Sequence, residues 1–229
     1  MKISFSTLAC PEYSWSDIYS MAKDIGFDGI EIRGLGDEIF AVNAQPFSAN
    51  KISETIKTLD RLNLEIPCLS SGCGLKYFDK TEENLNEISQ YISLAIKLKT
   101  PYIRILADRE PMPKGEVDDE KICEVLKKAA IMAEGTHITL LVETNGVYSD
   151  TKRLKRLIES VDSKHVAVLW DVHHPYRYAG EEPEETVKNL GSLIKFVHVK
   201  DSVMINGEAS YRLMGEGDLP IDRIMNSLS

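Results

Sequence analysis

The sequence lacks the features that mark secreted, membrane and nucleic-acid-binding proteins. No apolar run reaches the roughly 18 residues that cross a bilayer, and the first residues, MKISFSTLAC, lack the apolar segment of a signal peptide. The net charge is −9, so a phosphate backbone would be repelled unless a local basic patch overrode it. These absences predict a cytoplasmic protein with no nucleic-acid or membrane partner.

Cysteine is also scarce. The four cysteines are Cys10, Cys68, Cys73 and Cys123. Cys68 and Cys73 are the closest pair, but they lack zinc-site spacing and have no histidine nearby. We therefore expect reduced, structural thiols.

Strand-like and helix-like segments alternate along the whole chain with a period of roughly 30 residues, which predicts a parallel α/β sheet. The later strands are apolar along most of their length, as strands covered on both faces should be. The expected strands are residues 2–7, 28–33, 64–70, 101–107, 137–143, 165–171 and 195–200. The expected helices are residues 14–25, 48–62, 81–98, 116–134, 149–161, 183–191 and 219–228. Residues 201–218 are expected to be irregular.

Two parallel architectures fit this alternation, the closed barrel and the open doubly wound sheet. An open sheet usually shows a glycine-rich phosphate turn after its first strand, and the turn at residues 9–13, ACPEY, has no glycine. We therefore predict a TIM (β/α)8-type barrel. Such barrels typically need about 250 residues, and only seven strand–helix units are visible in this chain. The expectation is that the barrel lacks its eighth strand here because the sequence is a truncated form.

Polar side chains follow the ends of several predicted strands, where the catalytic groups of such barrels lie. Three consecutive strands deliver Glu143, Asp171 and His198, each after an apolar run. A buried carboxylate is costly by itself, and a shared divalent cation would remove that cost. Two carboxylates and an imidazole suit Mn²⁺, Mg²⁺, Co²⁺, Zn²⁺ or Fe²⁺ without choosing among them. Other polar residues at strand ends are Glu31, Arg33, Arg104, Asp108, His173, His174, Lys200 and Asp201.

Each of these residues also has an ordinary structural interpretation. A single glutamate at a strand end more often caps a helix or binds a loop, and His198 taken alone is typical of a satisfied core histidine. His173 and His174 could simply contact loop carbonyls. The recurrence of ligand-type residues on three adjacent strands favours the metal hypothesis.

The motifs VETNG, WDVHHPYRYAGEEP and FVHVKD on the fifth to seventh strands, with GFDGIEIR on the second, resemble the xylose-isomerase-like superfamily. The resemblance covers nearly the whole chain, which would form a single domain, residues 1–229, incomplete at its C-terminus. It implies one divalent metal ion held by Glu143, Asp171 and His198, with a fourth ligand, a glutamate on strand eight, missing from this chain. It also implies a substrate contact by His174, and we expect further contacts from Glu31, Arg104 and Lys200.

The resemblance further implies an isomerase or epimerase that acts on a small sugar, sugar acid or inositol derivative through an enediolate, with Glu143 as the catalytic residue. Dehydratases of the same superfamily share the enolisation step. Two alternatives stay open, an apurinic endonuclease-like metal hydrolase and a non-catalytic sugar-binding barrel. The endonucleases need extra histidines that the third strand, which ends in SSGCG, does not supply. Homo-oligomer formation also stays open.

Overall fold

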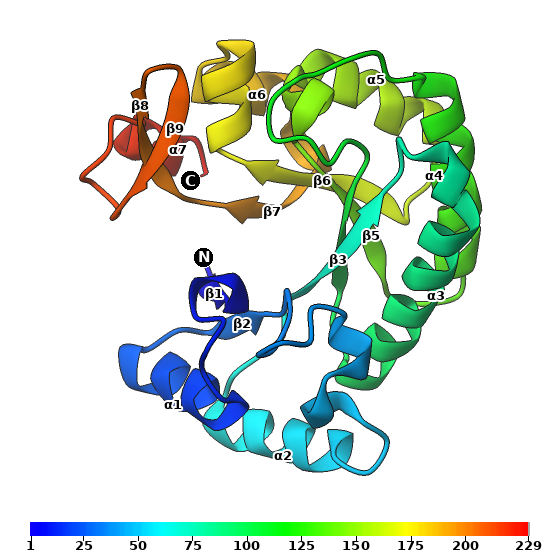
Figure 1. Ribbon diagram of the computed structural model, residues 1–229, viewed down its shortest axis with the longest axis vertical. Helices are drawn as coiled ribbons and strands as arrows, with labels where there is room; N and C mark the ends of the chain where they lie inside the picture. Colours follow the sequence, from blue (N-terminus) through cyan, green and yellow to red (C-terminus); the bar gives the residue numbers. More distant parts are fainter. Residues whose placement is uncertain (229) are drawn as a thin grey trace. The chain divides into compact units, whose positions relative to one another are not determined.

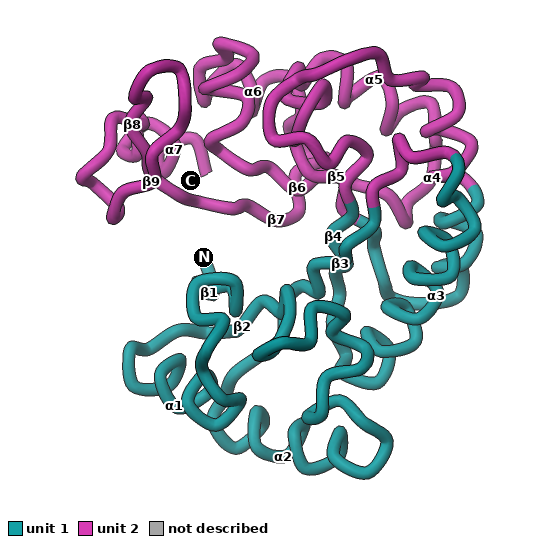
Figure 2. The backbone as a smooth tube through the Cα atoms, in the orientation of Figure 1, with its two compact units in different colours: residues 1–73, 79–105, 128–140 teal, residues 74–78, 106–127, 141–229 magenta. Residues whose placement is uncertain are grey.

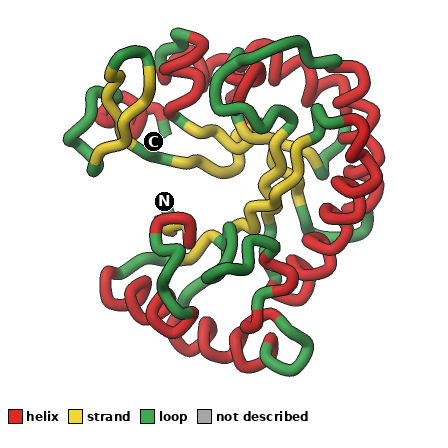
Figure 3. The backbone as a smooth tube through the Cα atoms, in the orientation of Figure 1, coloured by secondary structure: helices red, strands yellow, loops and turns green. Residues whose placement is uncertain are grey.

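The computed structural model describes residues 1–228, and the chain falls into two compact units. Unit 1 comprises residues 1–73, 79–105 and 128–140, and unit 2 comprises residues 74–78, 106–127 and 141–229 (Figure 2). Helices and strands alternate within each unit (Figure 3), which agrees with the predicted α/β class.

The first seven strands alternate with helices, as predicted; Figure 1 labels them except for β4, which is labelled in Figure 2. They are β1 (Ser4–Ser6), β2 (Gly29–Glu31), β3 (Cys68–Gly74), β4 (Tyr102–Leu106), β5 (Thr139–Glu143), β6 (Val166–Asp171) and β7 (Ile194–His198).

The pairing of these strands follows their order in the chain. β1 pairs with β2 in parallel, and five strands form a sheet in the order β3-β4-β5-β6-β7. Parallel bridges in unit 1 join Gly29 to Glu65 and Ile32 to Leu69, between the second strand and the third-strand segment. A doubly wound sheet reverses its strand order at a switch point. The consecutive order therefore favours the TIM-barrel class that the sequence predicts.

The helices that connect the strands are α1 (Trp15–Ile25), α2 (Ile52–Leu62), α3 (Thr81–Leu98), α4 (Asp119–Ala133), α5 (Thr151–Val161), α6 (Pro183–Leu190) and α7 (Ile221–Ser227). A short π-helical turn, η6 (Pro175–Ala179), precedes α6.

The expected helix starts are only partly right. α1 begins directly after Ser14, which caps it in a capping box with Asp17. The expected start at residue 48 is wrong, because α2 begins at Ile52 and the Ser48 hydroxyl bonds within its own turn. α5 begins at Thr151 in place of residue 149, and Asp150 caps it, since its carboxylate accepts the Arg153 N–H. Each correction moves a helix start by one to a few residues, which is where sequence patterns are least informative.

Strand β6 runs through the core of unit 2. Every residue of β6 is buried, from Val166 to Asp171. Trp170 and Val172 pack against Leu219 and Ile224, so α7 lies on the tryptophan side of this strand. Because side chains alternate across a strand, Asp171 points to the face opposite Trp170, away from this apolar cluster.

The segment after β7 is not irregular, and the expectation of an unstructured stretch at 201–218 is wrong. β8 (Asp201–Ile205) and β9 (Glu208–Arg212) form an antiparallel hairpin. Its two-residue loop is Asn206–Gly207, and both residues have positive φ, at 52° and 84°. A type I′ turn requires that geometry, and Asn-Gly is its preferred sequence. The signal for the hairpin was therefore present in the sequence.

Asp201 fixes the base of this hairpin to the chain that follows it. Its buried carboxylate accepts hydrogen bonds from the backbone N–H groups of Gly215 and Gly217, both at 2.9 Å. It also accepts from the N–H groups of Ser202 and Leu219. These bonds lower the pKa of Asp201, although burial alone would raise it. Three of these four backbone donors belong to residues 213–219, so the carboxylate ties this loop to the base of the hairpin.

Asp108 has a corresponding role for the loop after β5. Its fully buried carboxylate pairs with Lys76 and accepts the N–H of Val147 at 3.1 Å. The Asn145 amide donates to the Asp108 carbonyl at 2.9 Å. Gly146 lies between these two contacts with φ at +58°, and a Cβ there would lie 2.4 Å from Asp108 Cγ. This loop begins two residues after Glu143, so its position bears on the site.

The cysteines are all free thiols, and Cys10, Cys68 and Cys73 are buried. Burial raises the pKa of Cys73 to about 12, with help from the nearby Glu87 carboxylate, so this thiol is protonated at neutral pH. Within residues 1–228, every helix is too short or too polar to cross a membrane.

We predict that Gly146→Ala lowers the free energy of unfolding more than Gly180→Ala. Both glycines have positive φ, at 58° and 65°, so both substitutions carry the left-handed cost of roughly 1–2 kcal/mol. Only at 146 does the new methyl clash with Asp108, while at 180 it meets nothing within 4 Å. We expect an additional loss of about 1–3 kcal/mol at 146. Urea unfolding measures both, and equal losses would contradict the Asp108 contact.

Candidate metal centre

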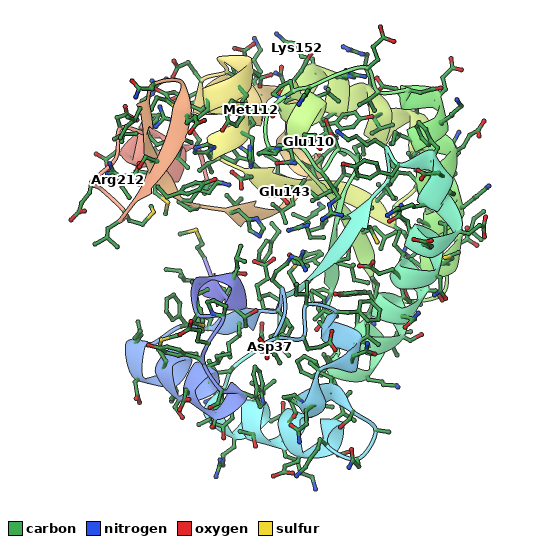
Figure 4. The ribbon with its side chains drawn as sticks, viewed as in Figure 1. Asp37, Glu110, Met112, Glu143, Lys152 and Arg212 are labelled. Atoms are coloured by element: carbon green, nitrogen blue, oxygen red, sulfur yellow. The ribbon has the colours of Figure 1, made fainter. Side chains whose placement is uncertain are left out.

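The ends of β5, β6 and β7 bring three potential ligands together in unit 2. Glu143, Asp171 and His198 are the last residues of these strands, and Asp171 pairs directly with His198 in the parallel register. One ligand atom from each lies within 4.8 Å of the other two, and Glu143 Oε1 is 3.5 Å from His198 Nδ1. Glu143 is labelled in Figure 4. The predicted convergence is therefore present, while the role of the three residues as ligands stays a prediction.

The chemistry of these residues fits a divalent cation. Two ligands at about 2.0–2.2 Å from one ion lie at most about 4.4 Å apart, so a 4.8 Å span needs only a small side-chain adjustment. Glu143 and Asp171 are 6% and 1% exposed, and two buried carboxylates so close together repel each other. The His198 side chain is 23% exposed and could supply a nitrogen ligand. This donor set suits Mn²⁺, Mg²⁺, Co²⁺, Zn²⁺ or Fe²⁺.

Thr144 joins the ends of β5 and β6, the two strands that carry Glu143 and Asp171. Its hydroxyl accepts the Asp171 N–H at 2.9 Å and donates to the Asp171 carbonyl at 3.1 Å. Its own N–H donates to the Leu169 carbonyl at 3.0 Å. A buried threonine that uses both its donor and its acceptor fixes the strand ends without competing for the ligand atoms. No sequence pattern marks Thr144 for this role, although the residue directly follows Glu143.

His174 and Lys200 lie beside Asp171. Lys200 Nζ is 2.7 Å from Asp171 Oδ2 and 3.2 Å from His174 Nε2, and that nitrogen is 3.7 Å from Asp171 Oδ2. An ammonium group can only donate, so His174 Nε2 accepts and the proton sits on Nδ1. Burial lowers the pKa of His174 and keeps the imidazole neutral.

Burial alone would lower the pKa of Lys200 as well. The Asp171 carboxylate outweighs this effect, and the pKa of Lys200 is raised. Lys200 is therefore a charged donor at neutral pH, next to a neutral histidine.

His173 faces a different partner. Its Nε2 lies 3.0 Å from the Ser202 hydroxyl at the base of the hairpin, and the same hydroxyl accepts from Arg177. Burial, followed by the charges of Lys200 and His174, lowers the pKa of His173 to about 4. The neighbouring histidines thus have different partners, with His174 beside Asp171 and His173 bonded to the hairpin.

Glu31 and Arg104, predicted substrate contacts, belong to unit 1. Glu31 is buried at the end of β2 and accepts a hydrogen bond from the Ser70 hydroxyl. Arg104 lies on β4 and donates to the Ser71 carbonyl at 3.1 Å. Both therefore have structural partners within unit 1, and their proposed contact with substrate stays a prediction.

A family model described as xylose isomerase-like TIM barrel matches residues 20–229. The chain belongs to this family. The matched residues cover nearly the whole chain, and they include the strands that carry Glu143, Asp171 and His198. The resemblance inferred from the sequence motifs is confirmed.

Several solved structures are similar to this xylose isomerase-like barrel. A probable 3-DHS dehydratase AsbF from Bacillus anthracis has a TM-score of 0.84 at 20% identity, covering 100% of this chain and 89% of that one. The IOLI protein with a binding zinc atom has a TM-score of 0.80 at 14% identity, covering 100% and 84%. The 3-keto-D-glucoside 4-epimerase YcjR from E. coli has a TM-score of 0.76 at 17% identity, covering 100% and 87%.

At these identities the structural matches show the fold alone. No curated protein gives a significant match to the chain.

We predict that the protein binds one divalent ion and that His198→Ala weakens this binding by at least about 100-fold. Loss of an outer-shell partner typically costs 10–100-fold in metal affinity, so loss of a ligand should cost at least as much. Isothermal titration of the chelator-treated protein with Mn²⁺ and Zn²⁺ measures the effect. His137→Ala, an exposed histidine before β5, is the control and should bind as the wild type does. Unchanged affinity in His198→Ala would remove this residue from the ligand set.

Proposed function

We propose that this protein is a divalent-metal-dependent isomerase or epimerase that acts on a small sugar, sugar acid or inositol derivative. The observation that carries the proposal is the set of Glu143, Asp171 and His198, whose ligand atoms lie within 4.8 Å of one another at the ends of three adjacent strands. Lys200 and His174 extend this set into a polar surface on one side of Asp171. Such a surface suits a substrate that carries neighbouring oxygen atoms.

Glu143, Asp171 and His198 would hold the ion. When bound, it would polarise a carbonyl and its neighbouring hydroxyl, which makes the adjacent C–H more acidic. All further chemistry falls to the side chains of the chain itself.

Glu143 is the residue that would move the proton. Its carboxylate is buried at the end of β5, so burial places a base in a site from which water is largely excluded. Lys200 would donate hydrogen bonds to the substrate oxygen on which negative charge develops, since it is a charged donor held in place by Asp171. His174 would orient a substrate hydroxyl through a neutral ring.

The comparisons support this chemistry at the level of the family. One similar structure is named as an epimerase, another as a probable dehydratase, and a third holds zinc. We infer an enzyme with a small carbohydrate substrate from this agreement together with the residues above. The endonuclease alternative would need extra histidines, which the third strand, ending in SSGCG, does not supply.

The experiment that tests the function measures proton exchange at carbon. The wild-type protein, loaded with Mn²⁺, is incubated in D₂O with D-fructose, L-erythrulose, scyllo-inosose and 3-dehydroshikimate. We expect deuterium incorporation and product with at least one compound, and loss of both after treatment with EDTA. Binding of a compound without any exchange would favour the non-catalytic alternative.

Glu143→Gln should abolish this turnover while the protein stays folded. The amide is close to the carboxylate in size but is not a base, so exchange should fall by at least about 100-fold. Glu159→Gln, an exposed substitution on α5, is the control. Proton NMR measures the exchange, and circular dichroism checks the fold. Full exchange in folded Glu143→Gln would show that another residue carries the proton.

His174→Ala and His173→Ala should have different effects. Loss of His174 removes a substrate contact beside Asp171 and should lower kcat/KM by about tenfold or more. Loss of His173 removes one of the partners of the Ser202 hydroxyl and should mainly lower Tm. Steady-state kinetics and thermal unfolding separate the two effects. The reverse pattern would exchange the roles of the two histidines.

A further inference from the structure

Tyr211 on β9 is an exposed aromatic ring beside the proposed site. Its ring centroid lies 5.6 Å from Lys200 Nζ and 5.7 Å from the centre of the His173 ring. Lys200 in turn contacts Asp171. Despite these neighbours, Tyr211 is 58% exposed. One part of the Tyr211 ring therefore lies against Lys200 and His173, and the rest is exposed to solvent.

The hairpin holds Tyr211 at a fixed place. Tyr211 pairs across the hairpin with Ser202, which is fully buried. The Ser202 hydroxyl is bonded to His173 and Arg177, and the preceding Asp201 binds four backbone N–H groups. The base of the hairpin, where Tyr211 lies, is thus tied to the residues that surround Asp171. A ring in such a position is organised before any ligand arrives.

A second tyrosine also lies beside the histidine pair. Tyr178, on η6, has its ring 5.6 Å from His173 and 5.7 Å from His174. Aromatic rings thus border the histidines from both the hairpin and the π-helical turn. Sites that bind small molecules combine apolar and aromatic walls with a few polar groups that fix orientation, and this arrangement has both.

We propose that Tyr211 is a specificity-determining residue that stacks against the apolar C–H face of a six-membered ring substrate, either a sugar ring or a carbocycle. The inference rests on the proposed function, which it extends from a substrate class to a substrate shape. The polar groups of such a ring would meet Lys200 and His174, while its C–H face covers the exposed part of the tyrosine. A rigid ring loses little conformational entropy when it stacks, whereas an open chain would have to be ordered first.

The exposure of Tyr211 separates this role from a structural one. A ring that leaves more than half of its surface to solvent fills no cavity, so its truncation should leave little unpacked space. Ile205 provides a matched control, because it is 48% exposed on the same hairpin. It pairs with Glu208, and the alternation of side chains places it on the face opposite Tyr211.

The test compares Tyr211→Ala, Tyr211→Phe and Ile205→Ala with the compounds that the wild type turns over. For a ring substrate, scyllo-inosose or 3-dehydroshikimate, we expect Tyr211→Ala to raise KM by about tenfold or more, with kcat within about twofold. Tyr211→Phe keeps the stacking face and should restore KM to within about twofold. Ile205→Ala should match the wild type. L-erythrulose, a four-carbon ketose that cannot form a six-membered ring, should show no KM change in any variant.

The outcomes separate this inference from the proposed function. Turnover by the wild type with an unchanged KM in Tyr211→Ala would overturn the stacking role and leave the function intact. An equal KM increase for the ring substrate and L-erythrulose, or a Tm loss of several degrees in Tyr211→Ala, would mean a structural role and would also overturn it. If the wild type turns over none of the compounds, calorimetric binding of scyllo-inosose and 3-dehydroshikimate decides. Weaker binding in Tyr211→Ala alone supports stacking, and no binding by the wild type refutes it.

Discussion

The burial of two carboxylates side by side is the constraint on which the site depends. Glu143 and Asp171 end apolar strands and are almost inaccessible to water, so their mutual repulsion is poorly screened. Lys200 offsets part of the charge from one side, and His198 supplies a nitrogen within reach of both. Removing a partner from such a group leaves an uncompensated buried charge.

Single buried polar side chains hold the neighbouring loops through hydrogen bonds. Thr144, Asp108 and Asp201 each turn a buried polar side chain towards backbone groups of a loop or strand end. Buried polar groups cost free energy unless they are fully bonded, so each anchor also excludes alternative loop arrangements. The strands set the depth of the three potential ligands, and these anchors set the paths of the loops around them.

The hairpin of β8 and β9 carries the residue that would select the substrate. Its base is tied to His173 and to the chain after β9, and its exposed face carries Tyr211. The metal-binding set would fix where the chemistry occurs, while the hairpin would fix the shape of the substrate. A ring at this position costs little stability, which leaves it free to serve recognition.

The sequence by itself determined the α/β alternation, the seven parallel strands, the family, and Glu143, Asp171 and His198 as one set. The alternation and the strands follow from hydrophobic period, the set of three residues from polar side chains at strand ends, and the family from a resemblance of short motifs such as VETNG and FVHVKD; all of these are local properties. The hairpin turn was also encoded locally, in Asn206–Gly207. Its strands lack a long apolar run, so the sequence pattern did not predict them. Only the tertiary structure decided that Lys200 pairs with Asp171 and that Tyr211 lies beside Lys200. Side chains from different strands meet through sheet register and hairpin geometry, and no local pattern encodes those distances.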